Sequence, residues 1–207
     1  MKHSLALSLL ALAAAGVASP AFAEAKGDWT LGVGVHQVAP KSDNGTLVNG
    51  TLKTEVGNSI RPTITFEYFV ADNVGVEVLG ALPFKHEISL KGLGKVAETK
   101  QLPPVVSLQY HFANDSKVTP FVGVGVNYTR FFGTDTKGAL KGSDIDLGSS
   151  WGVAAHAGLD FAVTDKSAVR VDVRWADIDS RVKLDGAKIG TANIDPMVYG
   201  VAYVLKF

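Results

Sequence analysis

The chain ends on the stretch YGVAYVLKF, residues 199–207, in which large apolar side chains occupy every second position. The residues between them are small or polar, with Val204 as the exception. A period of two is that of a β-strand whose two faces meet different surroundings. The end of the chain is therefore predicted to be a strand with one strongly apolar face.

Seven earlier runs show the same alternation. They are Trp29 to Val38, Ile60 to Val70, a run that begins at Val74, Leu102 to Phe112, Pro120 to Phe131, Trp151 to Phe161 and Ala168 to Trp175. With the terminal run they make eight candidate strands, an even number. An even-numbered sheet can close into an antiparallel barrel, which leaves no unpaired edge.

The connections between these runs alternate in length. Short polar turns follow the second, fourth and sixth runs. The other runs are followed by long segments rich in Gly, Asp, Lys and Ser: Ala39 to Ser59, His86 to Gln101, Phe132 to Ser149 and Ser180 to Asp195. Short turns at one end and long loops at the other are typical of outer-membrane barrels. The predicted fold is all-β: an eight-stranded antiparallel up-and-down transmembrane β-barrel.

The composition allows a soluble barrel as well, so the polarity of the two faces decides between them. The 207 residues are 46% hydrophobic and only 19% charged, and the formal net charge of zero gives no reason to expect a nucleic-acid partner. Gly27-Asp28-Trp29 resembles the Gly-x-Trp of lipocalins, which are soluble barrels. However, the face opposite the apolar one carries mainly Gly, Thr, Ser, Ala, Gln and His. Such residues suit a narrow lumen better than a surface in water, so the apolar face is predicted to contact lipid.

The first 23 residues have the features of a secretory signal peptide. A short basic start is followed by an apolar run from Leu5 to Ala18 and by Ala21-Phe22-Ala23. The run is shorter than the ~20 apolar residues of a spanning helix. We expect cleavage after Ala23, which leaves residues 24–207 as the mature barrel.

Several charged residues fall on the predicted lumen face. They are Arg61, Glu67, Glu77, Asp160, Arg170, Asp172 and Arg174. Buried charges are costly unless they are paired, and eight strands leave an interior little wider than side chains. We therefore expect a salt-bridge network that fills the barrel, with an ion pathway as the alternative.

The sequence contains no pattern that indicates catalysis or a metal centre. It has no Cys, and Ser107, His111 and His156 lie at separate heights of the lumen face without a recognised motif. His36 shares that face but forms no i, i+2 pair with another His. The two Asp-Ile-Asp sequences at 144–146 and 177–179 lack a full calcium-loop pattern. We expect no enzymatic activity, no cofactor and no metal.

Several segments resemble the OmpW (outer membrane protein W) family, in order and with closely matching spacing over the mature chain. They are VGVEVL at 74–79 with PFKH at 83–86, LPP at 102–104, PFVGVGVNYT at 120–129, SWG at 150–152 and DID at 177–179. The terminal strand with Phe207 at its end also resembles the signature that the outer-membrane assembly machinery recognises. The resemblance implies a barrel in the outer membrane of a Gram-negative bacterium.

The resemblance further implies a narrow, largely hydrophobic channel that is constricted near its external half. The family's constriction positions match Leu79 and Trp151 in this sequence. The alternation of the strand places Leu79 on the lumen face, two residues after Glu77, but it places Trp151 on the lipid face with Val153. Only a β-bulge near Gly152 would turn Trp151 inward.

Two functions remain open from the sequence. The first is a porin-like channel that binds small hydrophobic molecules and passes them into the membrane. The resemblance leaves open whether they leave through an opening in the barrel wall. The alternative is a structural or receptor barrel with a plugged lumen, whose external loops bind host, phage or colicin. The expected partners are outer-membrane lipids, small hydrophobic ligands and the assembly machinery.

Overall fold

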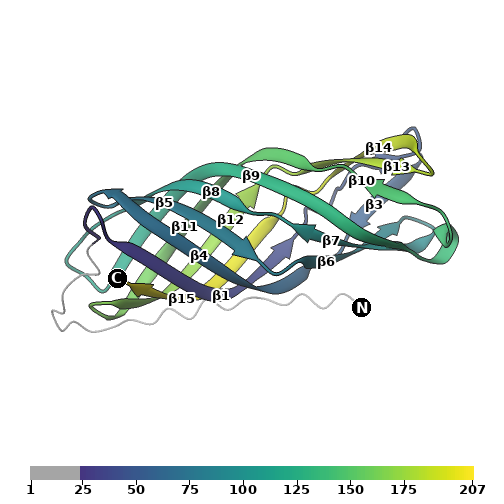
Figure 1. Ribbon diagram of the computed structural model, residues 1–207. Helices are drawn as coiled ribbons and strands as arrows, with labels where there is room; N and C mark the ends of the chain where they lie inside the picture. Colours follow the sequence, from purple (N-terminus) through teal and green to yellow (C-terminus); the bar gives the residue numbers. More distant parts are fainter. Residues whose placement is uncertain (1–23) are drawn as a thin grey trace.

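The computed structural model describes residues 24–207, in which one antiparallel sheet closes on itself as a barrel (Figure 1). The predicted leader and its cleavage after Ala23 lie outside the described residues. Eight strands form the closed wall: β1 (Trp29–Ala39), β4 (Ser59–Ala71), β5 (Val74–Ala81), β8 (Val105–His111), β9 (Val118–Thr136), β11 (Ser150–Thr164), β12 (Ser167–Ala176) and β15 (Met197–Lys206). Each pairs antiparallel with the next, which confirms the predicted fold class.

The barrel closes between its first and last strands. β1 pairs with β15 in continuous register, so that Leu31 lies opposite Leu205. At the end of this seam the rings of Trp29 and Phe207 stack with their centroids 4.2 Å apart. The backbone of Phe207 also exchanges hydrogen bonds with that of Trp29, at 2.9 and 3.3 Å. The terminal aromatic residue therefore completes the ladder and leaves neither end strand with a free edge.

The long connections, which the sequence predicts as loops, form additional strands beyond the membrane-spanning wall. These are β2 (Thr46–Leu47), β3 (Leu52–Val56), β6 (Phe84–Leu90), β7 (Gly94–Leu102), β10 (Ile145–Leu147), β13 (Asp179–Leu184) and β14 (Ala187–Asn193), with the short 3₁₀ helix η1 at Gly138–Leu140. They pair with one another and with the distal half of β9, and they extend the barrel at the end opposite the short turns (Figure 1).

The reason for this extension is that its strands enclose an apolar interior of their own. Alternate side chains such as Ile88, Leu90, Ile145 and Val182 point inward and pack into one buried cluster. The sequence did not indicate this alternation clearly, because Gly and Lys, which are typical of loops, occupy the turns and the outer face of the short strands. The prediction that these connections are long loops was wrong where they form β2, β3, β6, β7, β10, β13 and β14.

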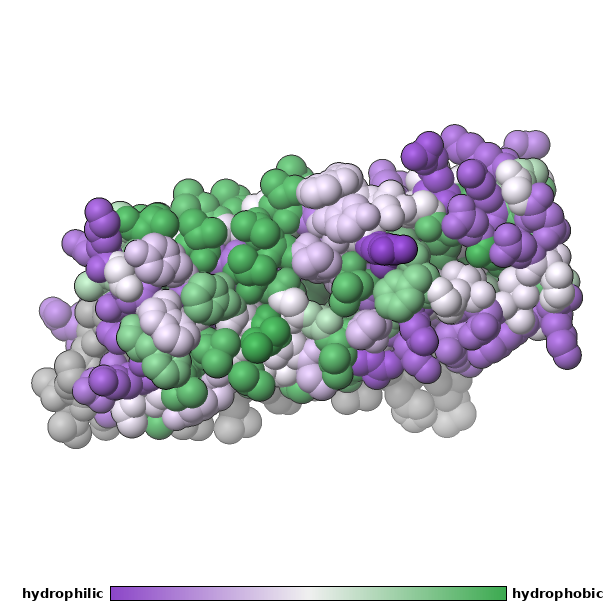
Figure 2. Space-filling model, in the orientation of Figure 1, coloured by the Kyte–Doolittle hydropathy of each residue, from purple (hydrophilic) through white to green (hydrophobic). Residues whose placement is uncertain are grey.

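The outer face of the wall is apolar, as the sequence predicts. Val33, Val124 and Ile64 are exposed by 57%, 65% and 50%, whereas Thr65 and Gln109 on the opposite face are buried. Figure 2 shows hydrophobic side chains gathered over the body of the barrel and hydrophilic ones over the end that carries β13 and β14. An apolar band of this kind is the surface that a transmembrane barrel presents to lipid. None of the described residues, 24–207, belongs to a helix long and apolar enough to cross a membrane.

Glycines on the lumen face let opposite side chains fill this narrow interior. A Cβ on Gly75 would collide with the Glu67 carboxylate, and one on Gly123 would collide with the His156 ring. The inner half of the lumen is therefore fully packed with side chains. A residue larger than glycine at these positions would displace them.

Candidate functional site: an apolar outer lumen above a charged inner lumen

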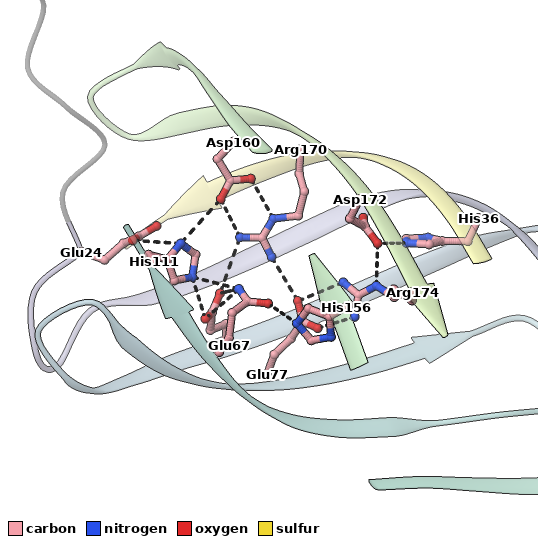
Figure 3. A network of polar contacts seen from close by, with 11 residues as sticks. Glu24, His36, Glu67, Glu77, His111, His156, Asp160, Arg170, Asp172 and Arg174 are labelled. Carbon is pink, nitrogen blue, oxygen red and sulfur yellow. Dashed lines mark hydrogen bonds and ion pairs between the residues drawn. The ribbon is translucent and has the colours of Figure 1, made fainter. Parts of the chain in front are cut away.

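The inner half of the lumen, next to the short turns, is filled by ion pairs centred on Arg170 (Figure 3). Its guanidinium forms a two-pronged contact with Asp160 on the neighbouring strand, with Nε to Oδ1 at 2.8 Å and Nη2 to Oδ2 at 2.7 Å. Its Nη1 donates to Glu77 Oε2 at 3.0 Å. Because β12 and β5 stand on opposite sides of the closed strand order, this last contact crosses the lumen.

Arg174 makes a second bridge across the same space. Its Nη1 donates to Glu77 Oε1 at 2.6 Å, and its Nε donates to Asp172 Oδ2 at 2.6 Å. Nε2 of His36 on β1 lies 3.3 Å from the same Asp172 oxygen. Charge-assisted hydrogen bonds of this length are strong, and here they connect three sides of the barrel.

Neutral polar groups extend the network toward the short-turn end. Glu67 lies opposite Glu77 in the β4–β5 ladder and accepts hydrogen bonds from the Gln109 side-chain amide at 2.9 and 3.0 Å. The Gln109 oxygen lies 2.7 Å from His156 Nε2. His111 Nε2 lies 3.0 Å from Glu67 Oε1. The alternation of the strands had already placed Gln109, His111 and His156 on the lumen face, but it could not show which charged groups they would contact.

Glu24 joins the network from outside the strands. The segment before β1 folds over the short-turn mouth, since Asn73 N–H donates to the Glu24 carbonyl at 3.0 Å and Gly27 N–H donates to Phe69 O at 2.9 Å. The Glu24 carboxylate is 3% exposed and points at His111 (Figure 3). Burial, together with the carboxylates of Asp160 and Glu67, raises the pKa of Glu24 to about 9. No strand pattern covers Glu24, and sequence reasoning missed it.

The structure thus brings together six of the seven predicted lumen charges and leaves Arg61 apart. Arg61 has the inward parity of β4, but its Nε donates to Pro83 O at 2.9 Å and its Nη1 to Ile60 O at 3.2 Å. It lines a hollow on the outer surface with Lys85 and Lys100. The β4–β5 ladder ends at Thr63, so Arg61 passes through the wall beyond it instead of entering the lumen.

The outer half of the lumen is apolar instead. A cavity of about 40 Å³ lies within the extension, lined mainly by aliphatic side chains and Phe131. Polar atoms of three lining residues have no partner among the described residues: Thr54 Oγ1, His86 Nε2 and both amide atoms of Gln101. The three side chains are at most 2% exposed. An apolar cavity with a few convergent polar groups has the make-up of a small-molecule site.

A second cavity of about 40 Å³ lies between the apolar cavity and the charged network. Gln101 lines both cavities, and Leu79 and Phe84 line the second, which reaches His156 and Arg174 at its other end. Leu79 is 7% exposed and lines this cavity, and its role as a constriction residue stays a prediction of the resemblance.

The structure corrects the other constriction residue, Trp151. Its ring is 72% exposed on the outer face and packs against Tyr128, with centroids 4.7 Å apart. The β9–β11 register runs without a shift through Trp151 and Gly152, so the bulge that would turn the ring inward does not exist. Trp151 therefore lies on the outer face of the wall and does not narrow the lumen.

The wall beside the second cavity is interrupted at three prolines. The β5–β8 ladder ends at Leu79 opposite Val105, and the β6–β7 ladder begins at Phe84 opposite Gln101. The break between them contains Pro83 on one side and Pro103 with Pro104 on the other. Proline has no N–H to donate, so these three positions contribute no backbone donor across the break.

A closed, even-stranded antiparallel barrel with an apolar outer band and a polar interior defines a transmembrane protein of the bacterial outer-membrane type. The comparisons with known proteins agree. Residues 25–207 match the family model described as the OmpW family, and the chain belongs to that family. It lies in the outer membrane of a Gram-negative bacterium.

Individual relatives cover nearly the whole chain. It is 35% identical to outer membrane protein W of Vibrio cholerae, over 96% of this chain and 97% of that protein. It is 29% identical to the dibenzothiophene metabolism operon protein PahQ of Pseudomonas aeruginosa, over 92% and 93%. Among solved structures, the crystal structure of OprG from Pseudomonas aeruginosa matches with a TM-score of 0.79 and 31% identity, over 90% of this chain and 98% of that one.

The charged network predicts a large loss of stability when one of its cations is removed. We expect Arg170→Met to lower the free energy of unfolding by about 3–5 kcal/mol, because Asp160 would remain buried without its guanidinium partner and Glu77 would keep only Arg174. Arg170→Lys keeps the charge but loses the two-pronged contact, so its free energy of unfolding should lie between those of wild type and Arg170→Met. Urea-induced unfolding in phospholipid vesicles measures the difference.

The matched control is Lys95→Met, which removes a cation from an exposed pair with Glu87 at 2.6 Å. Water screens that pair, so its loss should change stability far less. Equal effects of Arg170→Met and Lys95→Met would contradict the structural role of the network.

Proposed function

We propose that the protein takes up small hydrophobic molecules at the outer surface and passes them sideways into the membrane. The observation that carries this proposal is the division of the lumen: an apolar cavity in the outer half stands above a floor of ion pairs. An apolar molecule gains free energy by entering the cavity, at roughly 25 cal/mol per Å² of buried apolar surface. Moving on into the network of ion pairs would cost free energy, because the molecule would have to separate charges that stabilise each other. A straight path to the periplasm is therefore unfavourable.

The break in the wall offers the lateral exit. It lies beside the second cavity, which Leu79, Phe84 and Pro103 line. Strands joined by a full ladder cannot separate without losing several backbone hydrogen bonds, whereas the proline segments have few to lose. The route would run from the outer cavity past Gln101 and Leu79 and then between β5–β6 and β7–β8.

The unpartnered polar atoms narrow the class of ligand to apolar molecules that carry one polar group. Burial lowers the pKa of His86, which keeps its ring neutral. Its Nδ1 donates to Gly57 O at 2.7 Å, so Nε2 is a free acceptor toward the cavity. Gln101 offers both a donor and an acceptor there. A hydroxyl or carbonyl group would pair with these atoms while the rest of the molecule fills the aliphatic part.

The size of the cavities favours slender molecules. About 40 Å³ exceeds the 10–15 Å³ that one water needs, yet it accommodates only a few atoms at a time unless side chains move. The relationship to PahQ is consistent with an apolar ligand, since that protein is named for an operon that metabolises dibenzothiophene, a small apolar compound. We propose no enzymatic activity, and the relatives named above are outer-membrane or operon proteins that carry no enzyme name.

Filling the apolar cavity should block uptake. Ala192 lines the cavity and is 5% exposed, so Ala192→Phe would place a ring in the space that the ligand needs. Vesicles containing this variant should take up an apolar fluorescent tracer at least about fivefold more slowly than wild type. The control is Val124→Phe on the lipid face, where the native side chain is 65% exposed and a larger one meets only lipid. If wild-type vesicles match protein-free ones, the protein is not a conduit, and the receptor function becomes the better hypothesis.

Replacing the polar group between the two cavities should change selectivity. Gln101→Leu removes the unpartnered amide but keeps the volume of the side chain. Uptake of a long-chain alcohol or ketone should fall, and uptake of the matching alkane should stay equal or rise. The ratio of the two rates, measured in the same vesicles, is the readout. An unchanged ratio would remove Gln101 from ligand recognition without affecting the conduit itself.

Locking the proline break should stop lateral release. The chain has no native Cys, so Leu82→Cys with Pro103→Cys can be joined by a short reductant-cleavable cross-linker. We expect slow uptake after cross-linking and recovery after reduction. Val126→Cys with Val153→Cys is the matched control, because these residues lie directly opposite each other on the intact β9–β11 ladder. Equal uptake with and without the bridge at 82 and 103 would refute this exit.

A further inference from the structure

A hollow on the outer surface of the barrel gathers three cations beside the proline break. Its volume is about 460 Å³, and it is lined by Arg61, Pro62, Leu82, Pro83, Lys85, Lys100 and Phe132. It lies at the level where the β4–β5 ladder ends and the β6–β7 ladder begins. It shares no lining residue with the two apolar cavities inside the barrel, so it is a separate site.

Two of the cations are held close together by the sheet itself. Lys85 and Lys100 lie directly opposite each other in the β6–β7 ladder. Like charges in such a position repel each other and destabilise the pairing of the strands. On its other side Lys100 lies opposite Phe132 of β9, which brings no negative charge. None of the acidic side chains that the structure describes lines the hollow.

The charge of the hollow is only partly neutralised by its surroundings. Glu98 Oε1 lies 3.9 Å from Lys85 Nζ, but Glu98 Oε2 lies closer, at 3.2 Å, to Nζ of Lys137, which is outside the hollow. One carboxylate is thus shared by two lysines. Arg61 donates from Nε and Nη1 to two backbone carbonyl oxygens, which carry no formal charge. Within residues 24–207 its guanidinium forms no ion pair, so the hollow keeps an excess of positive charge.

The other side of the hollow is apolar and continues into the lipid-facing band. Pro62 of β4 and Leu82 after β5 are neighbours, since Leu82 N–H donates to Pro62 O at 3.1 Å. Leu82 is 59% exposed, and Ile64 and Val78, farther along the same two strands toward the short turns, are exposed as well. Cations above and aliphatic side chains below are the arrangement expected where lipid headgroups meet hydrocarbon.

We propose that this hollow binds the phosphate group of a phosphorylated lipid in the outer leaflet, whose acyl chains lie against Pro62, Leu82 and the apolar band. Arginine recognises phosphate with its planar fork of donors, and lysine recognises it as a point charge. A phosphate between Lys85 and Lys100 would remove the repulsion between them. A free phosphate ion would use only the polar side of the hollow, whereas a lipid also covers the apolar side.

The experiment is a lipid titration of the mature chain, folded in an uncharged detergent and followed by native mass spectrometry. The probe is lipid A with two phosphate groups, and we expect one molecule per chain at low lipid concentration. The same lipid A without phosphate should bind at least tenfold more weakly. Inorganic phosphate at the same concentration should not be retained.

Two variants locate the site. Lys85→Gln with Lys100→Gln should weaken lipid A binding at least tenfold, since each cation near an anionic lipid contributes about fivefold. Arg61→Gln, which removes the third cation, should weaken it by about fivefold. The heat-dependent shift in gel mobility that folded barrels show confirms that each variant is folded.

The matched control is Lys183→Gln with Lys188→Gln. These lysines also lie directly opposite each other, in the β13–β14 ladder, but Lys183 lies opposite Asp146 on its other side and neither residue lines the hollow. The control removes the same charge and should bind lipid A as wild type does.

The proposal fails if wild type retains no lipid A, or if lipid A without phosphate binds equally well. It also fails if the control pair weakens binding as much as the pair in the hollow, because the effect would then be one of net charge. Retention of inorganic phosphate as tight as that of lipid A would reduce the hollow to an ion site. The titration involves no tracer uptake, so its result is independent of the proposed transport function.

Discussion

The pairing of buried charges inside a narrow closed barrel is the constraint on which the rest of this structure depends. Arg170 and Arg174 stand on one wall, and Glu77 stands on the opposite wall and contacts both. Each of these charges has left water, and only its partners offset that cost. The contacts therefore require all the strands to be present in register at once. The ladder of the wall and the network in the lumen support each other, which explains why glycines face the bulky charged side chains.

This network also determines what the remaining lumen can do. The inner half is filled, so any cavity must lie in the outer half, where the hairpins β6–β7 and β13–β14 continue the barrel beyond the membrane. There most inward side chains are aliphatic and pack into one cluster, since the ion pairs of the inner half do not extend to this level. The change from apolar to ionic lining occurs near Gln101 and Leu79, beside the proline break. An apolar molecule that reaches this level has the ion pairs ahead of it and lipid beside it. Its free energy is lower in the lipid than among the ion pairs.

The period-two alternation of the sequence predicted the eight spanning strands and the orientation of their faces, because one residue step always reverses the face of a strand. The same rule fails where a ladder ends. Arg61 has inward parity but leaves through the wall beyond the last β4–β5 pair. The hairpins beyond the membrane were missed because their turns and outer faces carry loop-like residues. Trp151 shows the reverse case: parity placed it outside, the family resemblance placed it inside, and the unbroken register agrees with parity.

Glu24 shows why the electrostatics of the lumen cannot be read from the strands alone. The strands supply four buried carboxylates and two guanidinium groups, and Glu24 adds a fifth carboxylate from a segment without any period. Backbone hydrogen bonds to Asn73 and Phe69 hold this segment across the mouth and so direct the carboxylate inward. A carboxyl group in such a place keeps a proton, as its pKa of about 9 indicates. Its nearest side chain is His111, whose Nδ1 lies 3.1 Å from Glu24 Oε2, and this contact joins the segment before β1 to the polar network in the lumen.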